Sequence, residues 1–552
     1  MSIIAEEFTG EERKILEPYF TNVDRPIYAF TGRVPEEVVA VLFSKYSRST
    51  DSLRRNFLKL VKDPDSGFQE ILDSLGSGGD IGFAAALANA RDFFQRILIG
   101  FGDDSVGELG MAHVACEDVS NIATKRLESA RLTSPLEKST RYVVYDKAKF
   151  LREPRLMQSE FADGYIKVNE LLLNTYEGQI EPMKKFVKKH WPIGEFDLFG
   201  KKITDVTDER ELTRAKKAYE AAVKAKALDV LRYYMPASTL TNVGITANGR
   251  GFEYLITKLM SDELEEVRSI GKLMHEELSK VIPSLVKRSA PSEYYTETMK
   301  GMQNLAAVTF ENEAHKKSGT VTLVDYDKSA EEKVVAAALY SFSTLPMKLI
   351  RKKVRKMTSE ERLKVIDAYI GKRSNRREKP MRAAETAYYT FDILSDYGAY
   401  RDLQRHRMLT QIAQPLTVVN GYDTPPELAE AGFEEKFHEC MKAAADFYNK
   451  VYPKFPNEAQ YVVPFAYRIR CLFVLNLREA FHLIELRSMP QGHASYRRIA
   501  QDMFEQIRKV HPVFAHYMRY VFLDRRDSLG RLRGELETQK QLAKLGGREI
   551  NV

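Results

Sequence analysis

The chain has 552 residues, of which 44% are hydrophobic and 29% are charged. This composition is ordinary for a globular protein, and the length allows a large buried core without disulfide or metal staples. Only three cysteines occur, and the absence of a CxxC pair argues against a structural zinc site and a disulfide framework. No apolar run approaches the ~18 residues of a membrane span, and the acidic start of the chain has no signal-peptide pattern. We therefore expect a cytoplasmic protein with no metal, whose net charge of +7 permits an anionic ligand without demanding nucleic acid.

Apolar residues at helical spacing predict helices along most of the chain. The expected helices cover residues 38–43, 82–98, 109–127, 161–186, 212–234, 331–339, 387–403, 434–452 and 499–510. Residues 141–145 and 321–325 are rich in β-branched and aromatic side chains and predict strands. The charged tail after Asp524 predicts a peripheral helix or a frayed end, and Cys116, Cys440 and Cys471 lie in apolar helical contexts typical of a core. The predicted class is α+β with helix dominant.

An internal repeat organises the chain. Residues 235–256 align with residues 463–484 without a gap. The alignment sets Pro236 on Pro464, Asn248 on Asn476 and Arg250 on Arg478. Since order and spacing agree at both ends of the repeat, we predict two homologous lobes, 1–300 and 301–552, with the polar stretch 287–330 as the passage between them. The alternative is two unrelated helical domains.

The second half carries the cationic cluster Arg405-His406-Arg407. Two guanidinium groups beside an imidazole suit bidentate contact with a phosphate or a carboxylate. A solvated basic turn is the alternative interpretation of this tripeptide. Further polar residues follow downstream, namely Thr410, Asn476, Arg478, His482, Glu485, Arg487 and His493. Buried polar groups at this density need partners, and a ligand is one way to supply them.

The first half carries Ser134, Glu137, Ser139 and Arg141 in one short stretch. In an extended segment, alternation at period two would set Glu137, Ser139 and Arg141 on one face. A carboxylate, a hydroxyl and a guanidinium on one face suit a nucleotide with an imide edge and a phosphate. A solvated strand edge is the alternative.

Together these motifs resemble the signature RHRxxSxxExSxR of the flavin-dependent thymidylate synthases, split between the two halves. The second half keeps Arg405, His406 and Arg407, with Thr410 for the first Ser, but has Ala413, Pro415 and Thr417 at the Glu, the second Ser and the last Arg. The first half has Ser129 and Ala130 at the first two positions but keeps Arg131, Ser134, Glu137, Ser139 and Arg141. Each half departs from the signature where the other retains it.

The same complementarity continues downstream. The family's Arg four residues before a Pro is kept as Arg232, whereas the second half has Gln460 there. The family's later Leu-Arg is kept in the second half at Arg487, whereas the first half has Leu259. The Asn-x-Arg pair survives in both halves, and the upstream family glutamate corresponds to Glu108 and Glu385.

The resemblance implies a fold of two thymidylate synthase-like lobes and the reductive methylation of dUMP to dTMP. It implies FAD as cofactor, with NADPH and methylenetetrahydrofolate as co-substrates. The family forms homotetramers with sites between subunits, so a chain of two lobes is expected to form a homodimer that mimics the tetramer. Each chain is then expected to hold one nucleotide and one tightly bound FAD, at a site that takes one intact face from each lobe.

The resemblance also assigns roles to individual residues. The implied catalytic residues are Arg405, Arg487, Glu137 and Ser139; the implied substrate-binding residues are Arg141, Arg232, Arg131 and Ser134; the implied cofactor-binding residues are His406, Arg407, Asn476, Arg478, Glu385, Asn248 and Arg250.

Two alternatives remain at this stage. One is an enzyme of the same fold that acts on a different pyrimidine nucleotide. The other is a non-catalytic relative that binds nucleotides or nucleic acid through the basic stretches 348–356 and 373–382. We favour solvated helix faces for these stretches, so nucleic acid is not the expected partner.

Overall fold

The structure is a computed structural model. It describes residues 7–63 without 26, 32, 35, 37, 40, 41, 44–48 and 50, residues 107–311 without 199, residue 313, residues 319–526 and residues 529–544. Among these, no helix is long and apolar enough to cross a membrane. Helices and small antiparallel sheets make up the described parts, as the α+β prediction requires.

The chain forms two compact units that interleave in sequence. Unit 1 comprises residues 1–117, 126–137 and 242–312, and unit 2 comprises residues 118–125, 138–241 and 313–552. Unit 2 therefore contains a long stretch of the first half as well as the second half. The predicted lobes 1–300 and 301–552 divide the chain in a different way, by sequence repeat and not by compactness, and their boundaries remain a prediction.

Unit 1 contains most of a three-stranded sheet with the order β1-β5-β2. Its strands are β1 (Met111–Ser120), β2 (Thr133–Glu137) and β5 (Leu240–Asn248). Strands β2 and β5 are antiparallel, with Thr133 opposite Ala247 and Glu137 opposite Val243. The helices are α1 (Gly10–Leu16), α3 (Leu53–Lys62), α11 (Gly249–Met260), α12 (Glu265–Leu278), α13 (Pro283–Val286) and α14 (Glu293–Thr309), and α11 packs against α12 and α13.

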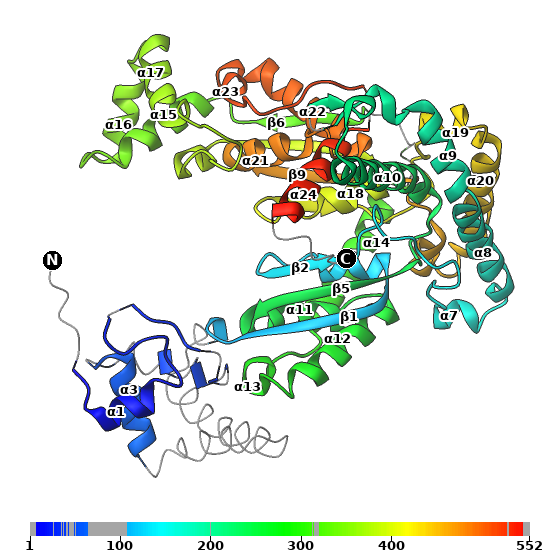
Figure 1. Cartoon of the computed structure of the whole chain (residues 1–552). Coiled ribbons are helices and arrows are strands. Elements are labelled where there is room, and N and C mark those ends of the chain that lie inside the picture. The colour runs from blue at the N-terminus through cyan, green and yellow to red at the C-terminus, as the bar shows by residue number, and fades with distance from the viewer. Residues whose placement is uncertain are drawn as a thin grey trace. The chain divides into compact units, whose positions relative to one another are not determined.

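Unit 2 is built on a four-stranded antiparallel sheet with the order β6-β7-β9-β8. Its strands are β6 (Val321–Tyr326), β7 (Tyr388–Asp396), β8 (Thr410–Ala413) and β9 (Arg468–Asn476). Burial alternates along β7 and β9, so that residues such as Tyr389, Phe391 and Phe473 face the core. The helices α21 (Leu477–Arg487) and α22 (Ala494–Val510) pack on the sheet strands (Figure 1).

A helical layer completes unit 2. Helix α8 (Ala162–Gly178) lies beside α20 (Glu434–Val451), and α10 (Glu209–Leu231) packs against α9 (Ile180–His190) and α24 (Leu532–Lys544) (Figure 1). The remaining elements are α6 (Asn121–Leu127), which follows β1, α7 (Pro154–Met157), α15 (Ala330–Tyr340), α16 (Met347–Arg355), α17 (Ser359–Ile370), α18 (Tyr397–Leu403), α19 (Pro426–Glu430), α23 (Pro512–Tyr517), the short strands β3 (Asp197–Leu198) and β4 (Lys201–Lys202), and the 3-10 helices η3 (Ile193–Glu195), η4 (Ile203–Asp205), η5 (Arg232–Tyr234), η6 (Arg382–Thr386) and η7 (Glu458–Val462).

The repeat appears inside unit 2 as a local two-fold contact at Pro236 and Pro464, which form an isolated antiparallel bridge. The backbone bonds around it come in reciprocal pairs. Ala237 N donates to Val463 O at 3.0 Å, and Phe465 N donates to Met235 O at 2.9 Å; Ser238 N donates to Tyr461 O at 2.8 Å, and Ala466 N donates to Tyr233 O at 3.2 Å. Two-fold symmetry produces such pairs: where residue i of one repeat bonds to residue j of the other, residue j of the first repeat bonds in the same way to residue i of the second. The structure thus confirms the register that sets Pro236 on Pro464.

The predicted helices and strands are mostly correct where a single hydrophobic period, either helical or strand-like, runs through the whole segment. The helices expected at 212–234, 331–339, 434–452 and 499–510 are present, as are the strand at 321–325 and a helix in the charged tail. The single helix expected at 161–186 is instead two helices, α8 and α9, which meet at Gln179. Two predictions are wrong because a strand runs directly into a helix: residues 109–127 form β1 then α6, and residues 387–403 form β7 then α18. The strand expected at 141–145 is a turn instead. The helix expected at 82–98 lies outside the described residues, and that at 38–43 lies partly outside them.

The cysteines are buried, as expected of core residues. Cys440 lies in α20, but Cys116 and Cys471 lie in the strands β1 and β9 and not in helices. Burial raises the pKa of the Cys116 thiol to about 11. These thiols are therefore protonated at neutral pH and have packing roles.

Candidate functional site

An arginine-rich cavity of about 210 Å³ lies within unit 2. It is lined by Ser139, Thr140, Arg141, Tyr142, Arg232, Gly398, Arg401, Asp402, Arg405, Arg487 and Tyr496. Five of these side chains are arginines and one is a carboxylate. Such an excess of guanidinium groups in a confined space favours an anionic ligand, because arginine binds phosphate and carboxylate through paired hydrogen bonds.

The cavity joins residues that are far apart in the sequence. Ser139 and Arg141 lie in the turn after β2, and Arg232 begins η5 at the end of α10. Arg405 follows α18, and Arg487 is the last residue of α21. The structure therefore brings five of the sequence-predicted site residues together, three from the first half and two from the second.

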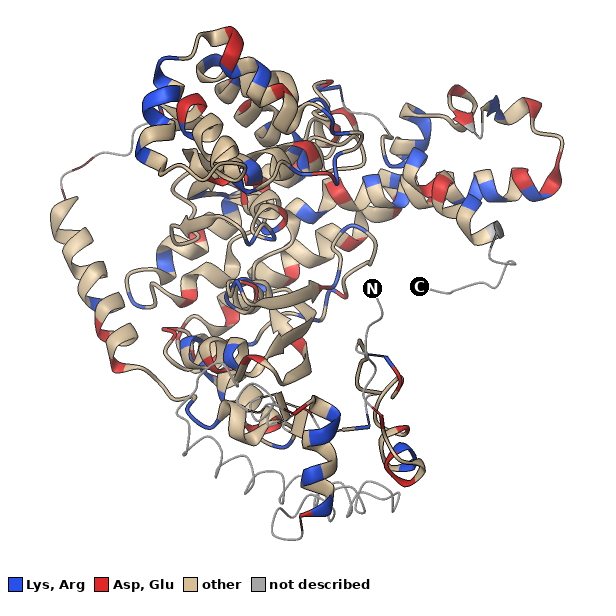
Figure 2. Ribbon diagram, turned by 90° about the vertical axis from the view of Figure 1, so that its left-hand side faces the viewer, with Lys and Arg blue, Asp and Glu red and all other residues tan. Residues whose placement is uncertain are grey.

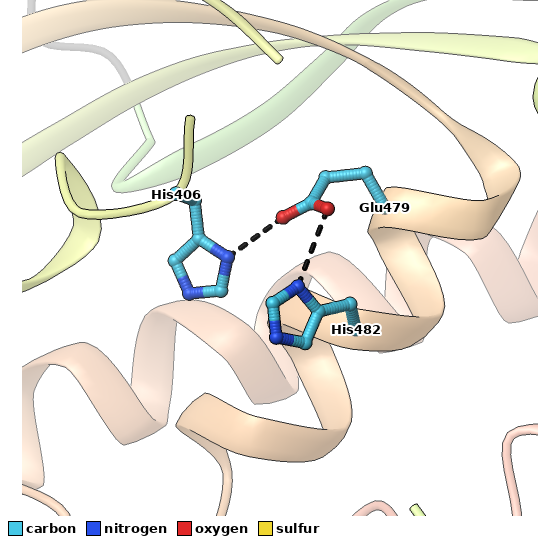
Figure 3. Close-up of side chains that lie close together, drawn as sticks. All are labelled: His406, Glu479 and His482. Atoms are coloured by element: carbon cyan, nitrogen blue, oxygen red, sulfur yellow. Dashed lines mark hydrogen bonds and ion pairs between the residues drawn. The ribbon is translucent and has the colours of Figure 1, made fainter. Parts of the chain in front are cut away.

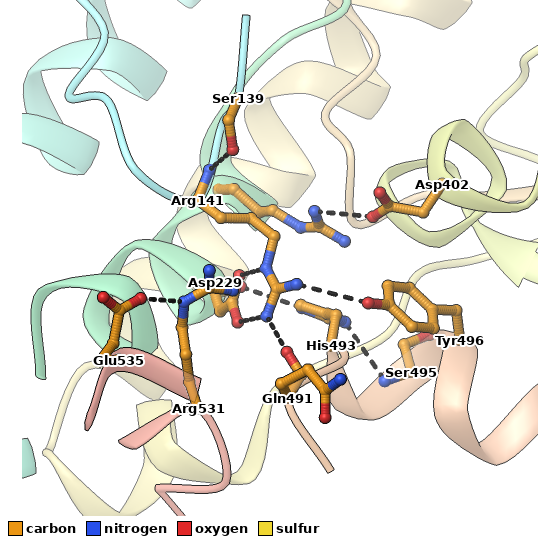
Figure 4. A network of polar contacts seen from close by, with 11 residues as sticks. Ser139, Arg141, Asp229, Asp402, Gln491, His493, Ser495, Tyr496, Arg531 and Glu535 are labelled. Atoms are coloured by element: carbon orange, nitrogen blue, oxygen red, sulfur yellow. Dashed lines mark hydrogen bonds and ion pairs between the residues drawn. The ribbon is translucent and has the colours of Figure 1, made fainter. Parts of the chain in front are cut away.

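Arg141 is held by a bidentate ion pair with Asp229 of α10 (Figure 4). Its Nε and one terminal nitrogen each lie 2.6 Å from a carboxylate oxygen of Asp229. The other terminal nitrogen donates to the Tyr496 hydroxyl at 3.3 Å. Burial disfavours the ionised Asp229 carboxylate, but Arg141 outweighs this effect and holds the pKa of Asp229 below its usual value. Asp229 thus fixes the direction of a cation that reaches the cavity.

Arg232 is the most deeply buried cation of the cavity, with 1% of its surface exposed. One terminal nitrogen lies 3.3 Å from Asp402, while Nε and the other terminal nitrogen have no hydrogen-bond partner. Buried donors without partners are costly, and an anion in the cavity would satisfy them. Gly398 makes room for this guanidinium, because a Cβ at that position would lie 3.2 Å from Arg232 Nε.

Asp402 is the carboxylate that faces these arginines. Burial opposes its ionisation, but Arg232, Arg405, Arg487 and Arg141 together lower the pKa of Asp402 well below its usual range. Asp402 is therefore ionised at neutral pH and compensates part of the positive charge. With the paired Asp229 included, cations still outnumber carboxylates around the cavity.

His406 is buried and both of its ring nitrogens are hydrogen-bonded; Figure 3 shows the bond to Glu479. Its Nδ1 is 2.7 Å from Glu479, and its Nε2 accepts from Arg487 Nε at 3.0 Å. Glu479 also pairs with Nδ1 of His482 at 3.3 Å. The ligand atoms of His406, Glu479 and His482 lie within 4.8 Å of one another, as in a metal site. However, Arg487 Nε can only donate, so Nε2 is the acceptor and Nδ1 carries the proton that faces Glu479. This arrangement does not fit a metal on Nδ1.

The predicted flavin-binding pair Asn476 and Arg478 lies at the start of α21. The Asn476 side chain caps the helix by accepting from Glu479 N at 2.9 Å. Arg478 donates to Pro380 O at 2.8 Å and lies 3.4 Å from Glu385. The Asn476 amide nitrogen and about a third of the Arg478 side chain remain available to a ligand. Arg407, which follows His406, is exposed.

The first-half counterparts of this pair lie in unit 1 and make the same contacts. Asn248 caps α11 by accepting from Gly251 N at 2.8 Å, and Arg250 pairs with Glu108 at 2.5 Å. The segment Asp103–Ser105 upstream of Glu108 lies outside the described residues.

The other predicted substrate residues of the first half belong to unit 1. Arg131 and Ser134 are exposed, whereas Glu137 is buried at the end of β2. The expectation that Glu137, Ser139 and Arg141 share one face of an extended segment is wrong. The strand ends at Glu137, and Arg141 N turns back to donate to the Ser139 hydroxyl at 3.2 Å.

A larger cavity of about 420 Å³ shares Arg141 with the first. Four pairs of its charged lining residues neutralise one another: Arg141 with Asp229, Lys226 with Glu427, Arg468 with Asp423 and Arg525 with Asp502. Arg498 and Arg531 also line this cavity, and Arg531 pairs with Glu535 outside it. His493, singled out in the sequence, lines this cavity, where its Nε2 donates to Asp229 O and its Nδ1 caps α22. Since its charges are largely compensated, the larger cavity is the weaker candidate for an anion.

Sequence reasoning missed Asp229, Asp402, Glu479 and Tyr496. Asp402 had a detectable signal, because Arg401 and Asp402 introduce charges into an otherwise apolar segment just before the Arg405 cluster. Glu485, which the sequence grouped with Arg478 and His482, instead forms a buried ion pair with Arg373 at 2.5 Å.

The basic stretches are compensated only in part, since Lys348, Lys352, Lys353 and Lys356 of the first stretch are exposed. Arg351 and Arg355 of α16 both pair with Glu332, and Arg373 is buried. Basic and acidic residues are both scattered over the described helices (Figure 2).

The fold is that of a helix-rich α+β protein, and one of its cavities is lined by five arginines. The sequence model of the thymidylate synthase complementing protein family, Thy1, matches residues 77–284 and again residues 322–513. Because the two matches together cover more than half of the sequence, the chain belongs to this family, as a tandem form with two lobes.

Several relatives resemble the chain over different lengths. It is 39% identical to a UPF0159 protein of Chlamydia muridarum, over 96% of this chain and 98% of the relative. It is 35% identical to the UPF0159 protein Ta1429 of Thermoplasma acidophilum, over 83% and 93% of the two chains. A flavin-dependent thymidylate synthase of Clostridium tetani is 26% identical over 36% of this chain and 70% of the relative. A solved UMP/dUMP methylase of Streptomyces cacaoi superposes with a TM-score of 0.29 at 16% identity, over 38% of this chain and 96% of the other, which is too distant to inform the site.

Proposed function

We propose that the chain is an FAD-dependent thymidylate synthase-like enzyme that converts dUMP to dTMP at one composite site. The observation that carries this proposal is the cavity of unit 2, where Arg141 and Arg232 of the first half meet Arg405 and Arg487 of the second. The family membership, together with relatives named flavin-dependent thymidylate synthases, supports the reaction class.

The cavity would bind the nucleotide through its anionic groups. Arg232 offers two buried donors without partners, and Arg141 is directed by Asp229. Charge-assisted hydrogen bonds to a phosphate contribute about 1.5–3 kcal/mol each, so a few of them suffice for specific binding. Positive charge around the pyrimidine would also stabilise an anionic uracil. We assign Ser139, which lines the cavity, to orientation of the nucleotide.

FAD would be held by the exposed Arg407 and the half-buried Arg478, together with Asn476. Arg407 and Arg478 supply cations for its diphosphate, and the Asn476 amide nitrogen supplies a donor. His406 has no free nitrogen for a flavin, because Glu479 and Arg487 occupy both. When bound and reduced, FAD supplies a hydride, so no protein nucleophile is required. NADPH as reductant and methylenetetrahydrofolate as one-carbon donor complete the proposed reaction.

A homodimer of this chain would reproduce a four-lobed assembly. The repeat motivates this, since closed two-fold dimers are the commonest oligomers, and the family resemblance supplies the four-lobed reference. Sedimentation equilibrium is expected to give the dimer mass at micromolar concentration; a stable monomer would contradict the proposed assembly.

The test combines the spectrum of the purified protein with nucleotide titrations. We expect the absorption of a bound flavin and calorimetric binding of dUMP that is tighter than that of UMP or dCMP. Tighter binding of another pyrimidine nucleotide would retain the site but reassign its substrate. A protein without flavin and without nucleotide affinity would refute the proposed function.

A further inference from the structure

Glu479, His406 and Arg487 form a chain of hydrogen bonds that reaches the arginine-rich cavity, and Figure 3 shows its first bond, between Glu479 and His406. Glu479 accepts from His406 Nδ1 at 2.7 Å, and His406 Nε2 accepts from Arg487 Nε at 3.0 Å. His406 and Glu479 are only 3% and 6% exposed. Arg487 ends this chain and lines the cavity.

The donors and acceptors of this chain allow a single arrangement. A guanidinium group has no acceptor, so the bond between Arg487 and His406 requires a lone pair on Nε2. A neutral imidazole then carries its proton on Nδ1, and that proton needs an acceptor. Glu479 is this acceptor, and burial together with Arg487 keeps the imidazole neutral by lowering the pKa of His406 to about 4.

We propose that Glu479 is a positioning residue for nucleotide binding: by fixing the tautomer of His406, it holds Nε of Arg487 and directs the terminal nitrogens of Arg487 toward the ligand. The carboxylate touches neither the ligand nor the reacting atoms in this role. His482 supports it by occupying the second carboxylate oxygen of Glu479 at 3.3 Å. This inference rests on the proposed function, since it deepens the role of the same cavity.

The first lobe offers a natural comparison, because it lacks every member of the chain. The positions that correspond to His406, Glu479, His482 and Arg487 hold Ala130, Gly251, Tyr254 and Leu259. Glu479 is thus present where Arg487 and His406 are present and absent where both are absent. A helix-stabilising role alone would not predict this, since the Asn cap and the Arg-Glu pair are kept in both lobes.

Gly251, which corresponds to Glu479, has close neighbours in unit 1. A Cβ at Gly251 would lie 3.2 Å from both Asn248 Oδ1 and Leu132 O, and 3.3 Å from Ala247 Cβ. Contacts this short require the neighbours to shift. A side chain at Gly251 would therefore press on Leu132 and Ala247, which a glycine avoids.

Glu485, a second glutamate of α21, illustrates a residue whose role is structural only. Glu485 pairs with Arg373 at 2.5 and 3.0 Å, and both are buried. Neither residue lines the arginine-rich cavity. Loss of Glu485 should therefore lower stability through an uncompensated buried charge, whereas loss of Glu479 should lower stability less and affect the ligand more.

The binding test is a double-mutant cycle on the full-length protein with dUMP as the probe. We expect Glu479→Ala to weaken dUMP binding about tenfold and Glu479→Gln, which keeps an acceptor, to weaken it less than about threefold. Because Glu479 acts through Arg487, the double variant Glu479→Ala/Arg487→Ala should bind dUMP no more weakly than Arg487→Ala alone. Additive losses, or wild-type affinity in Glu479→Ala, would overturn the inference.

A second measurement reports the tautomer without any ligand. The ¹⁵N shifts of the His406 imidazole distinguish a protonated Nδ1 from a protonated Nε2, and we expect Nδ1–H in the wild type and in Glu479→Gln. In Glu479→Ala we expect this preference to be lost. As a matched control, Tyr389→Phe removes a hydrogen bond of 2.9 Å to the buried imidazole of His511 elsewhere in unit 2, and it should leave the His406 tautomer and dUMP affinity unchanged. An unaltered tautomer in Glu479→Ala would contradict the proposal.

The two hypotheses fail in different ways. Absence of dUMP binding to the wild type would refute the proposed nucleotide site, while the tautomer measurement would still test the role of Glu479. If the wild type binds dUMP and the Glu479→Ala variant binds it equally tightly, the positioning role is refuted and the proposed function stands.

Discussion

Helices α11 and α21 begin in the same way and differ along their length. Asn248 and Asn476 cap them through the same side-chain bond, at 2.8 and 2.9 Å. Arg250 and Arg478 each pair with an upstream glutamate. Near its end, however, α11 carries the buried Leu259, whereas α21 carries Arg487 at the cavity.

This comparison separates contacts that maintain the lobe from contacts that build the site. Caps and surface ion pairs stabilise the helix in both lobes and are kept in both. Of these two helices, only α21 contributes residues that line or support the cavity, namely Arg487 and Glu479. The Asn-x-Arg pair is therefore a weak indicator of a ligand, and the arginine at the helix end is a strong one.

The largest expected effect comes from removing one arginine of either half. Arg141→Ala and Arg405→Ala should each weaken dUMP binding about 10- to 100-fold, since each removes a charge-assisted contact of about 1.5–3 kcal/mol. Calorimetric titration measures this loss. Thr417→Ala is the matched control, because Thr417 stands in the second half where Arg141 stands in the first. Unchanged affinity in Arg141→Ala would place the ligand elsewhere.

The next effect is a pH dependence that belongs to unit 2. Burial lowers the pKa of His406 to about 4 and that of His493 to about 3, below the unfolded value of about 6.5. Their contribution to stability is complete above pH 6.5 and is lost as the pH falls toward 4 and 3. Burial instead raises the pKa of Asp396 to about 6, so its contribution is present below its unfolded pKa and is lost as the pH rises through 6.

Variants separate these opposite contributions. Between pH 6.5 and 4, Tm should fall less steeply in His493→Gln than in the wild type, and more steeply in Asp396→Asn. The exposed His516 provides a control, and His516→Gln should keep the wild-type slope. Identical slopes in all four proteins would show that neither buried group titrates in this range.

The smallest effect concerns the two caps. Asn248→Ala and Asn476→Ala should each lower stability by about 1 kcal/mol, because each leaves the first turn of its helix without a side-chain acceptor. Only Asn476→Ala should also reduce the flavin content of the purified protein, since of the two capped helices only α21 lines the arginine-rich cavity. Thermal melts and flavin quantified after denaturation measure both quantities. Equal flavin loss in both variants would indicate a second functional flavin site.

The repeat, its register and five cavity residues could be predicted from the sequence, because they follow from spacing and from side-chain chemistry. The strand-to-helix junctions could not. In 387–403 the period changes from two to 3.6 within one apolar run, and a single helical window averages over the change. The turn that carries Ser139 and Arg141 is likewise set by a local side-chain bond and not by a pattern.

The supporting carboxylates were also beyond sequence reasoning. Asp229 lies 88 residues from Arg141, and Glu479 lies 73 residues from His406. Only the fold brings such pairs together. A residue that acts through another carries no motif of its own, so its role becomes visible only when the hydrogen bonds are known.

The central claim is that the two halves build one site and not two. Equilibrium dialysis of dUMP against protein of known active concentration tests it directly, because it counts nucleotides per chain. One nucleotide per chain is the predicted result, since Arg405 and Arg487 occur in one half and Arg141 and Arg232 in the other. Two equivalent nucleotides per chain would contradict the composite site.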